Sequence, residues 1–212
     1  MQRLRFLLLI QLVIFIGASP SIVLGAEHSQ VTINPEQSNV EWTGKKVTGS
    51  HHGTVQIHEG HAYLSDGALT GGEFSLDMQS IAVKDIDNPK DNAKLTGHLQ
   101  SDDFFSAEDH RYATFDITNV RPLEPKDRDG ANCEIFGDLS IKGITRTIHF
   151  PARVIVKDTE AKATATVAVD RTKFNVRYGS GKFFENLGDK LIYDQFEVTL
   201  SLVGKIEAAG SS

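Results

Sequence analysis

The stretch AKATATVAVD, residues 161–170, decides the fold because it alternates two kinds of side chain. One set is small or apolar and comprises Ala163, Ala165, Val167 and Val169, and the other set comprises Thr164, Thr166 and Asp170. Successive side chains of a β-strand point to opposite faces. The alternation therefore predicts a strand with one buried face and one face in water.

The same period of two recurs along most of the chain. It is found in GGEFSLDMQSIAV (71–83), YATFDITNV (112–120), CEIFGDLSI (133–141), IHFPARVIV (148–156) and FEVTLSLVG (196–204). Short turn signals lie at 65–67, 142–145 and 157–160, which predicts up-and-down antiparallel pairing. Strands that are apolar on one face must close on themselves or pack on a second sheet, and closure also removes exposed edges.

Two inserts break the alternation, and each carries a pair of phenylalanines. The first, NPKDNAKLTGHL (88–99), predicts one short helix or a pair of turns and runs into Phe104 and Phe105. The second, residues 175–195, contains Phe183 and Phe184. Long inserts with apolar residues usually cover something. We expect both to close one end of the barrel, with one Phe of each pair pointing inward and the other holding the insert down. The alternative is that the pairs only anchor loops to the rim.

Five stretches, in order, resemble the YceI family of lipocalin-like, polyisoprenoid-binding domains of secreted bacterial proteins. They are VTINPEQSNVEW (31–42), GHLQSDDFFS (97–106), ATFDITNV (113–120), GDLSIKGITRTIHFPARV (137–154) and AVDRTKFNV (168–176). The second stretch is close to the family's His-Leu-(Lys/Arg)-Ser-x-Asp-Phe-Phe, with Gln100 in place of the basic residue. His110 and Arg111 stand where the family often has Tyr-Pro.

This resemblance implies an all-β, eight-stranded antiparallel lipocalin-like barrel with one short helical insert, which holds a long-chain isoprenoid or similar amphiphilic lipid inside. Burial of such a chain is worth about 0.8 kcal/mol per methylene. Small residues at Ala152, Ala163, Ala165 and Gly137 favour an interior with room for it. The side chains expected to contact the ligand are Trp42, Phe74, Leu76, Met78, Phe104, Phe105, Phe115, Ile117, Ile135, Leu139, Val167, Phe174, Phe183, Phe184, Phe196 and Val198. The alternative is a protein-interaction barrel with a filled core and no ligand.

Catalytic and metal chemistry find little support in the sequence. There is no Gly-x-Ser-x-Gly, no Gly-rich phosphate loop after a strand and no His-Glu-x-x-His. We therefore expect no enzyme, no cofactor and no metal, although His58 and His61 are close enough in sequence for a weak metal hypothesis. His98 and the pair Asp170–Arg171 are interpreted as structural groups that tie loops together.

The N-terminal residues predict where the protein is located, and its net charge limits the kinds of partner that it can bind. Residues 1–26 contain Arg3 and Arg5, an apolar run and then small residues, which predicts a signal peptide cleaved after Ala26. The domain is then 27–212, with a formal charge of −8, and the protein is periplasmic or secreted. An acidic chain of this kind disfavours nucleic acid. A homodimer and a membrane-associated donor or acceptor of the lipid stay open. Cys133, the single cysteine, is expected to be a buried apolar residue.

Overall fold

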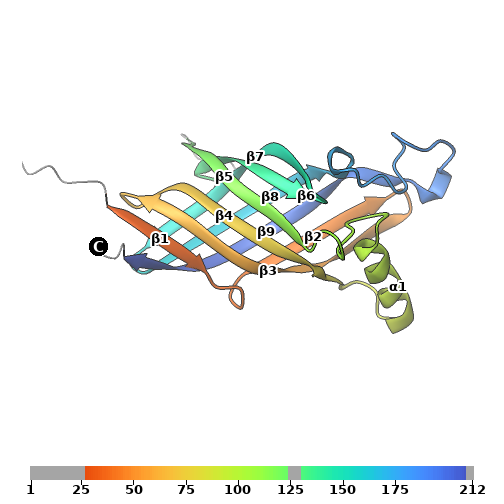
Figure 1. Cartoon of the computed structure of the whole chain (residues 1–212), viewed down its shortest axis with the longest axis horizontal. Coiled ribbons are helices and arrows are strands. Elements are labelled where there is room, and N and C mark those ends of the chain that lie inside the picture. Colours follow the sequence, from red (N-terminus) through yellow and green to blue (C-terminus); the bar gives the residue numbers. More distant parts are fainter. Residues whose placement is uncertain (1–26, 124–129, 209–212) are drawn as a thin grey trace, which may run out of the picture.

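The computed structural model describes residues 27–123 and 130–208, and the expected signal peptide lies outside them. These residues fold as a β-barrel with one α-helix (Figure 1). Its elements are β1 (His28–Ile33), β2 (Asn39–Lys46), β3 (Gly49–Ser65), β4 (Ala68–Val83), α1 (Pro89–Gln100), β5 (Tyr112–Pro122), β6 (Cys133–Ile141), β7 (Ile144–Lys157), β8 (Glu160–Asp170), the 3₁₀ turns η1 (Arg171–Phe174) and η2 (Gly188–Lys190), and β9 (Ile192–Ala208).

Nine strands occupy eight positions in the closed antiparallel wall. β1 and β2 both pair with β3 on one side and with β9 on the other. β1 covers the second half of β3, where Val31 faces Ala62, and β2 covers the first half, where Trp42 faces Gly53. The two strands therefore occupy one position of the barrel wall, one after the other. The expected eight-stranded antiparallel barrel is confirmed.

Consecutive strands from β2 to β9 are joined as neighbours in the sheet, as the turn signals predicted. The β6–β7 turn is formed by Lys142 and Gly143, whose φ angles are 54° and 71°. Two successive residues with positive φ match the twist of a two-residue hairpin. Asp66 and Gly67 repeat this between β3 and β4, with φ angles of 50° and 75°.

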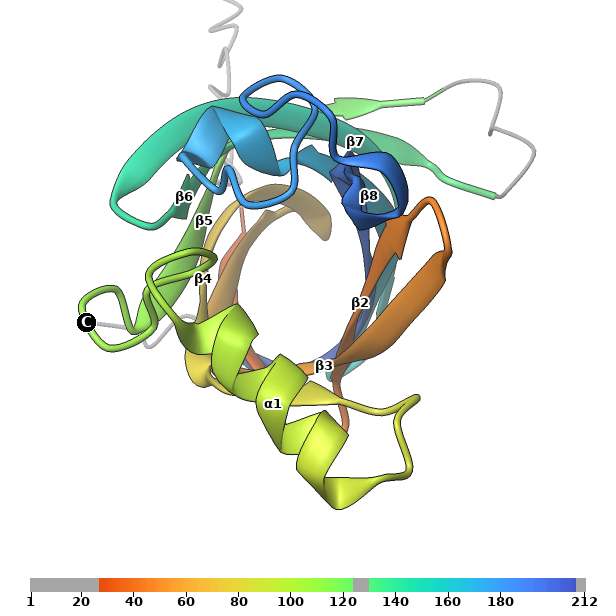
Figure 2. The same cartoon turned by 90° about the vertical axis from the view of Figure 1, so that its right-hand side faces the viewer.

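Helix α1 and the β8–β9 connection lie at the same end of the barrel, on opposite sides of its rim (Figure 2). The helix begins where Asn88 accepts hydrogen bonds from the backbone N–H groups of Lys90 and Asp91, and Pro89 occupies its first turn. Leu99 is the buried residue of the helix. The insert at 88–99 is therefore one helix and not a pair of turns. Within the described ranges, no helix has the length and apolarity needed to cross a membrane.

Candidate functional site

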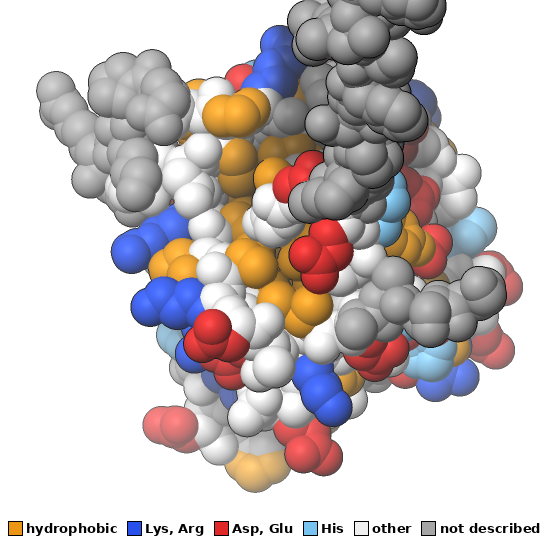
Figure 3. Space-filling model, turned by 90° about the vertical axis from the view of Figure 1, so that its left-hand side faces the viewer, with side chains coloured by type: hydrophobic (Ala, Val, Ile, Leu, Met, Phe, Trp, Pro, Cys, Tyr) orange, Lys and Arg blue, Asp and Glu red, His pale blue; other side chains and the backbone are white. Residues whose placement is uncertain are grey.

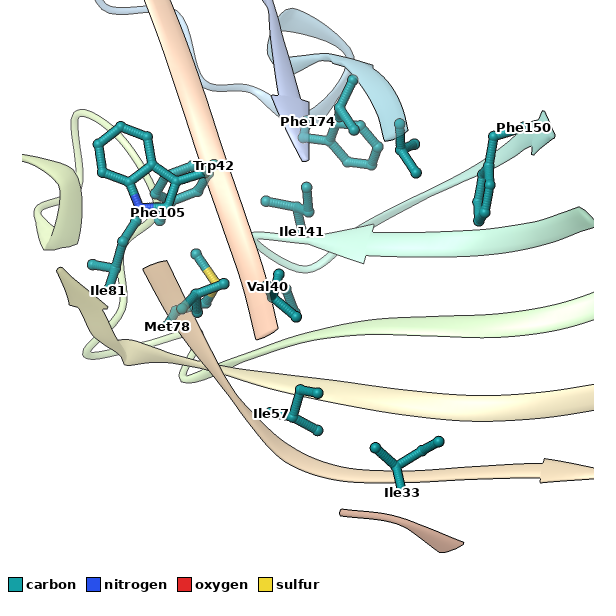
Figure 4. Packing of buried hydrophobic residues seen from close by; sticks show 14 of the residues in the cluster. Ile33, Val40, Trp42, Ile57, Met78, Ile81, Phe105, Ile141, Phe150 and Phe174 are labelled. Atoms are coloured by element: carbon teal, nitrogen blue, oxygen red, sulfur yellow. The ribbon is translucent and has the colours of Figure 1, made fainter. Parts of the chain in front are cut away.

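An apolar cavity of about 250 Å³ runs inside the barrel. Each strand and α1 contribute to its lining, from Leu99 and Trp42 near the helix to Leu64 and Leu202 near the far end. Trp42, Phe105, Met78 and Ile81 lie together at one end of the interior (Figure 4). The volume is near the lower end of the roughly 300–1,000 Å³ that is usual for small-molecule sites.

Thirteen of the sixteen side chains expected at the ligand line this cavity. They are Trp42, Phe74, Leu76, Met78, Phe104, Phe105, Phe115, Ile117, Ile135, Leu139, Val167, Phe196 and Val198. All but Trp42 and the two phenylalanines of the first insert come from stretches that alternate in the sequence, so strand periodicity placed them correctly. The sequence reasoning missed Leu99 in α1 and Tyr193 at the start of β9. It also missed the lining residues of β3, for which no alternating stretch was identified: Val55, Ile57, Ala62 and Leu64.

Small residues account for part of the open interior. Ala152, Ala163 and Ala165 line the cavity from the adjacent strands β7 and β8, and Ala152 pairs directly with Ala165. Gly137 does not add room, contrary to expectation. A Cβ at Gly137 would lie 2.4 Å from the ring of Phe115, so that ring already occupies the space that the glycine leaves.

The first phenylalanine pair lies entirely inside. Phe104 and Phe105 are both buried and both line the cavity. The expectation that one ring points inward while the other holds the insert down is therefore wrong. The residues form a turn rather than a strand, and the alternation rule therefore does not separate the two rings. The ring centre of Phe105 lies 6.2 Å from that of Phe196, and the ring centre of Phe104 lies 4.9 Å from that of His98.

The second phenylalanine pair lies outside. Phe183 and Phe184 are 43% and 50% exposed, and neither lines the cavity. Phe174 differs from expectation in another way, because it is fully buried in the core but does not reach the cavity. These three positions belong to segments outside the strands, where alternation does not predict the direction of a side chain.

Comparison with known proteins settles the family. The model of the YceI-like domain matches residues 31–204. The chain belongs to this family. Among curated relatives, a UPF0312 protein of Pectobacterium carotovorum is 28% identical over 106 residues, and Protein YceI of Escherichia coli O157:H7 is 27% identical over the same length. Each alignment covers 46% of this chain and 52% of the relative, so the chain spans about half the length of the curated relatives it matches.

Two solved structures share the fold of this YceI-like barrel. BcnA of Burkholderia cenocepacia superposes with a TM-score of 0.61 at 18% identity, over 81% of this chain and 98% of BcnA. A polyisoprenoid binding domain of Saccharophagus degradans superposes with a TM-score of 0.56 at 13% identity, over 87% of this chain and the whole of that domain. At such identities the likeness concerns the fold.

Arg171 fixes the end of the YceI-like barrel that carries the second insert. Its side chain is almost fully buried and donates hydrogen bonds to four backbone carbonyls, those of Val176, Tyr178, Ile192 and Tyr193. Burial lowers the pKa of the guanidinium below its ordinary value. Arg171 reaches the cavity wall, but its donors are committed to the backbone, which confirms its role as a tie between loops.

His98 holds its loop through aromatic packing. Its ring lies edge-on to Phe104 and Tyr178, with centroid distances of 4.9 and 4.5 Å. Three buried polar atoms have no hydrogen-bond partner within residues 27–123 and 130–208, namely His98 Nε2, Ser75 Oγ and Trp42 Nε1. Trp42 is the one of these three residues that lines the cavity.

Three other histidines have separate partners. The His51 Nδ1 atom lies 2.8 Å from a carboxylate oxygen of Asp85, and the His61 Nδ1 atom lies 2.8 Å from the amide nitrogen of Gln30. The ring of His58 stacks on Tyr112. No group of three metal-ligating side chains is found in the part of the chain that the structure describes. Cys133 is buried, as expected, and burial raises the pKa of its thiol.

Proposed function

We propose that the protein is a binding protein of the cell envelope that holds a long-chain isoprenoid, or a similar amphiphilic lipid, inside the barrel. The observation that carries this proposal is the continuous apolar lining of the cavity. The interior is not filled by side chains, which supports this proposal over a protein-interaction barrel with a filled core. A relative in fold is described as a polyisoprenoid binding domain, which supports the same ligand class here.

The chemistry of the wall supports binding without catalysis. Asp102 and Asp103, the acidic pair beside the first phenylalanines, do not line the cavity. Arg171 reaches it with four of its five N–H donors bonded to backbone carbonyls. An apolar chain in this interior gains about 0.8 kcal/mol per buried methylene without any charged partner.

Trp42 supplies a polar contact for a neutral part of the ligand. Its indole N–H is buried and has no acceptor in the described chain, and an unpaired buried donor costs about 1–3 kcal/mol. A ketone, ether or hydroxyl oxygen of the lipid would satisfy it. Trp42→Phe keeps an aromatic ring and removes the donor, so we expect several-fold weaker lipid retention. Equal retention by Trp42→Phe would remove this contact from the proposal.

The location follows from the N-terminal residues. Arg3 and Arg5, the apolar run and the small residues up to Ala26 support secretion through the inner membrane with cleavage after Ala26. Mass spectrometry of the protein from the envelope fraction should give an N-terminus within two residues of Glu27. Recovery of the chain with an intact Met1 would contradict cleavage.

Solvent extraction of the purified native protein tests the ligand. We expect its mass spectrum to contain a lipid with a long apolar chain in near-stoichiometric amount. Ala165→Phe adds bulk inside the cavity and should at least halve the bound lipid. Ala168→Phe makes the same change on the exposed face of the same strand and should leave the lipid content unchanged. An extract without lipid, or equal lipid in both variants, would contradict the proposal.

A further inference from the structure

We propose that the end of the barrel that carries the β8–β9 connection docks on the surface of a bilayer that contains anionic lipid. Seven large hydrophobic side chains are exposed among the described residues, and five of them belong to this end. We call these five the aromatic end: Val47, Tyr178, Phe183, Phe184 and Tyr193. Their exposed fractions lie between 43% and 52%.

The members of the aromatic end come from two neighbouring segments. Val47 lies in the turn between β2 and β3, and its backbone N–H donates to the carbonyl of Leu191 at 3.2 Å. The other four residues belong to 178–193, a segment closed by a hydrogen bond from Ile192 N–H to the Gly179 carbonyl at 2.8 Å. The β2–β3 turn and the β8–β9 connection lie at the same end of the barrel (Figures 1 and 2).

The exposed phenylalanines are held outward by a fixed turn. Ser180 is fully buried, its hydroxyl donates to Asp194 at 2.6 Å, and its carbonyl accepts from both Phe183 N–H and Phe184 N–H at 3.1 Å. Arg171 ties the preceding and following backbone together. The rings are therefore presented to water by an ordered scaffold, at a cost in exposed apolar area that an interaction would recover.

Positive charge accompanies the exposed rings. The exposed residues between 173 and 190 include four basic side chains, Lys173, Arg177, Lys182 and Lys190, and two acidic ones, Glu185 and Asp189, in a chain whose formal charge is −6. The ammonium of Lys182 is paired with Asp170 and Asp194, so the basic side chains that can face a membrane are Lys173, Arg177 and Lys190. The guanidinium of Arg177 lies 4.9 Å from the centre of the Phe183 ring. Aromatic residues flanked by Lys and Arg are the composition that binds the interface of an anionic membrane.

The size and position of the patch favour a bilayer over a protein partner. Five half-exposed side chains offer on the order of 500 Å², less than the roughly 800 Å² per partner that a stable protein interface buries. Tyr193 is 49% exposed and also lines the cavity, so the aromatic end is continuous with the interior. At the opposite end, Figure 3 shows hydrophobic side chains in the centre, with Lys, Arg, Asp and Glu around them.

The other two exposed aromatics provide a matched control. The hydroxyl of Tyr63 donates to Glu73 at 2.7 Å, and the ring of Tyr112 stacks on His58 at 4.5 Å, so both have partners on the barrel wall. Neither belongs to the aromatic end. The double variant Phe183→Ser with Phe184→Ser removes two exposed aromatic rings from the aromatic end. The control, Tyr63→Ser with Tyr112→Ser, also removes two exposed rings, but from the barrel wall.

Vesicle flotation with protein purified after expression of the full chain tests the proposal. The probes are vesicles of phosphatidylcholine alone and of phosphatidylcholine with phosphatidylglycerol. We expect the native protein to float with the second kind and to be released by added salt. Phe183→Ser with Phe184→Ser should lower the vesicle-bound to free ratio at least tenfold, while the Tyr63/Tyr112 double variant stays within twofold of native.

Lipid content, measured on the same samples, separates this inference from the proposed function. The Phe183/Phe184 double variant should retain its copurified lipid and its melting temperature, because neither ring lines the cavity or the core. Absence of flotation by the native protein, or equal flotation by the Phe183/Phe184 variant, would overturn membrane docking. A concentration-dependent dimer abolished by the same variant would also overturn it, since the surface would then bind a second copy.

Discussion

The two phenylalanine pairs are alike in sequence and opposite in structure. Phe104 and Phe105 are buried against the cavity, whereas Phe183 and Phe184 are about half exposed at the same end of the barrel. What differs is the scaffold beneath each pair. The first follows α1, whose end brings the chain back over the interior, and the second follows a turn around Ser180 that points away from it. Local composition alone therefore does not distinguish a phenylalanine pair that lines the cavity from one that is exposed on the surface.

Removal of the tie beneath the second pair should have the largest effect. Arg171→Met keeps most of the side-chain volume and leaves the carbonyls of Val176, Tyr178, Ile192 and Tyr193 without their donor. We expect a loss of at least about 3 kcal/mol in the free energy of unfolding. Denaturant unfolding measures it.

Lys182→Met is the control for Arg171. Lys182 is half exposed and bridges Asp170 and Asp194, so its loss should destabilise the fold far less than the loss of the buried guanidinium. Arg171→Lys should not rescue stability, because an ammonium lacks the planar fork that reaches four carbonyls. Equal midpoints for Arg171→Met and Lys182→Met would show that the second insert does not depend on the buried guanidinium.

The two pairs themselves should respond unequally to truncation. Phe104→Ala removes a buried ring, and we expect a loss of about 3 kcal/mol, or a melting temperature lower by roughly 6–12 °C. Phe183→Ala removes an exposed ring and should stay within about 0.5 kcal/mol of the native protein. Thermal melting of both variants checks the comparison. A Phe183→Ala variant as unstable as Phe104→Ala would mean that the second pair anchors its loop after all.

A smaller effect on stability is expected in both inserts at acid pH, because each is anchored by a carboxyl with a lowered pKa. The hydrogen bond from Arg111 is the main cause for Asp77; for Asp170, burial raises the pKa, but hydrogen bonds from Thr172 and Lys182 outweigh it. Such carboxyls stabilise the fold above their unfolded pKa of about 4, and the contribution is lost as pH falls through the folded value.

The Asp77 anchor can be isolated with one substitution. Asp77→Asn should be less stable than the native protein at neutral pH. The difference in the free energy of unfolding should narrow as the pH falls from about 4, the unfolded pKa, through the lowered pKa of the folded carboxyl, because protons then bind the unfolded native chain more strongly. Urea unfolding at a series of pH values measures this difference. A difference that stays constant down to low pH would exclude the Asp77–Arg111 pair as an acid-sensitive anchor.

Strand periodicity is the reason why the sequence predicts which side chains of the strands face the interior. Ala163, Ala165 and Val167 face the interior because alternation leaves no other choice once one face of β8 is buried. The family motifs supplied the count of eight positions, but not that β1 and β2 share one of them. That sharing depends on the pairing of both with β3 and β9, which is non-local. The directions of the side chains in the two inserts were predicted wrongly for the same reason. A side chain outside a strand takes its direction from distant anchors such as Arg171.

The shared position of β1 and β2 sets an order of events during synthesis. Strands from β3 to β8 each pair with the strand made just before them, so a growing chain extends an open sheet one hairpin at a time. The two edges of that sheet, β8 on one side and β1 with β2 on the other, meet only through β9, where Ser29 lies opposite Ala208. Until the last seventeen residues of the described chain leave the ribosome, both edges lack partners. A nascent chain that stalls before β9 is therefore an apolar sheet with two free edges, the form most prone to aggregate.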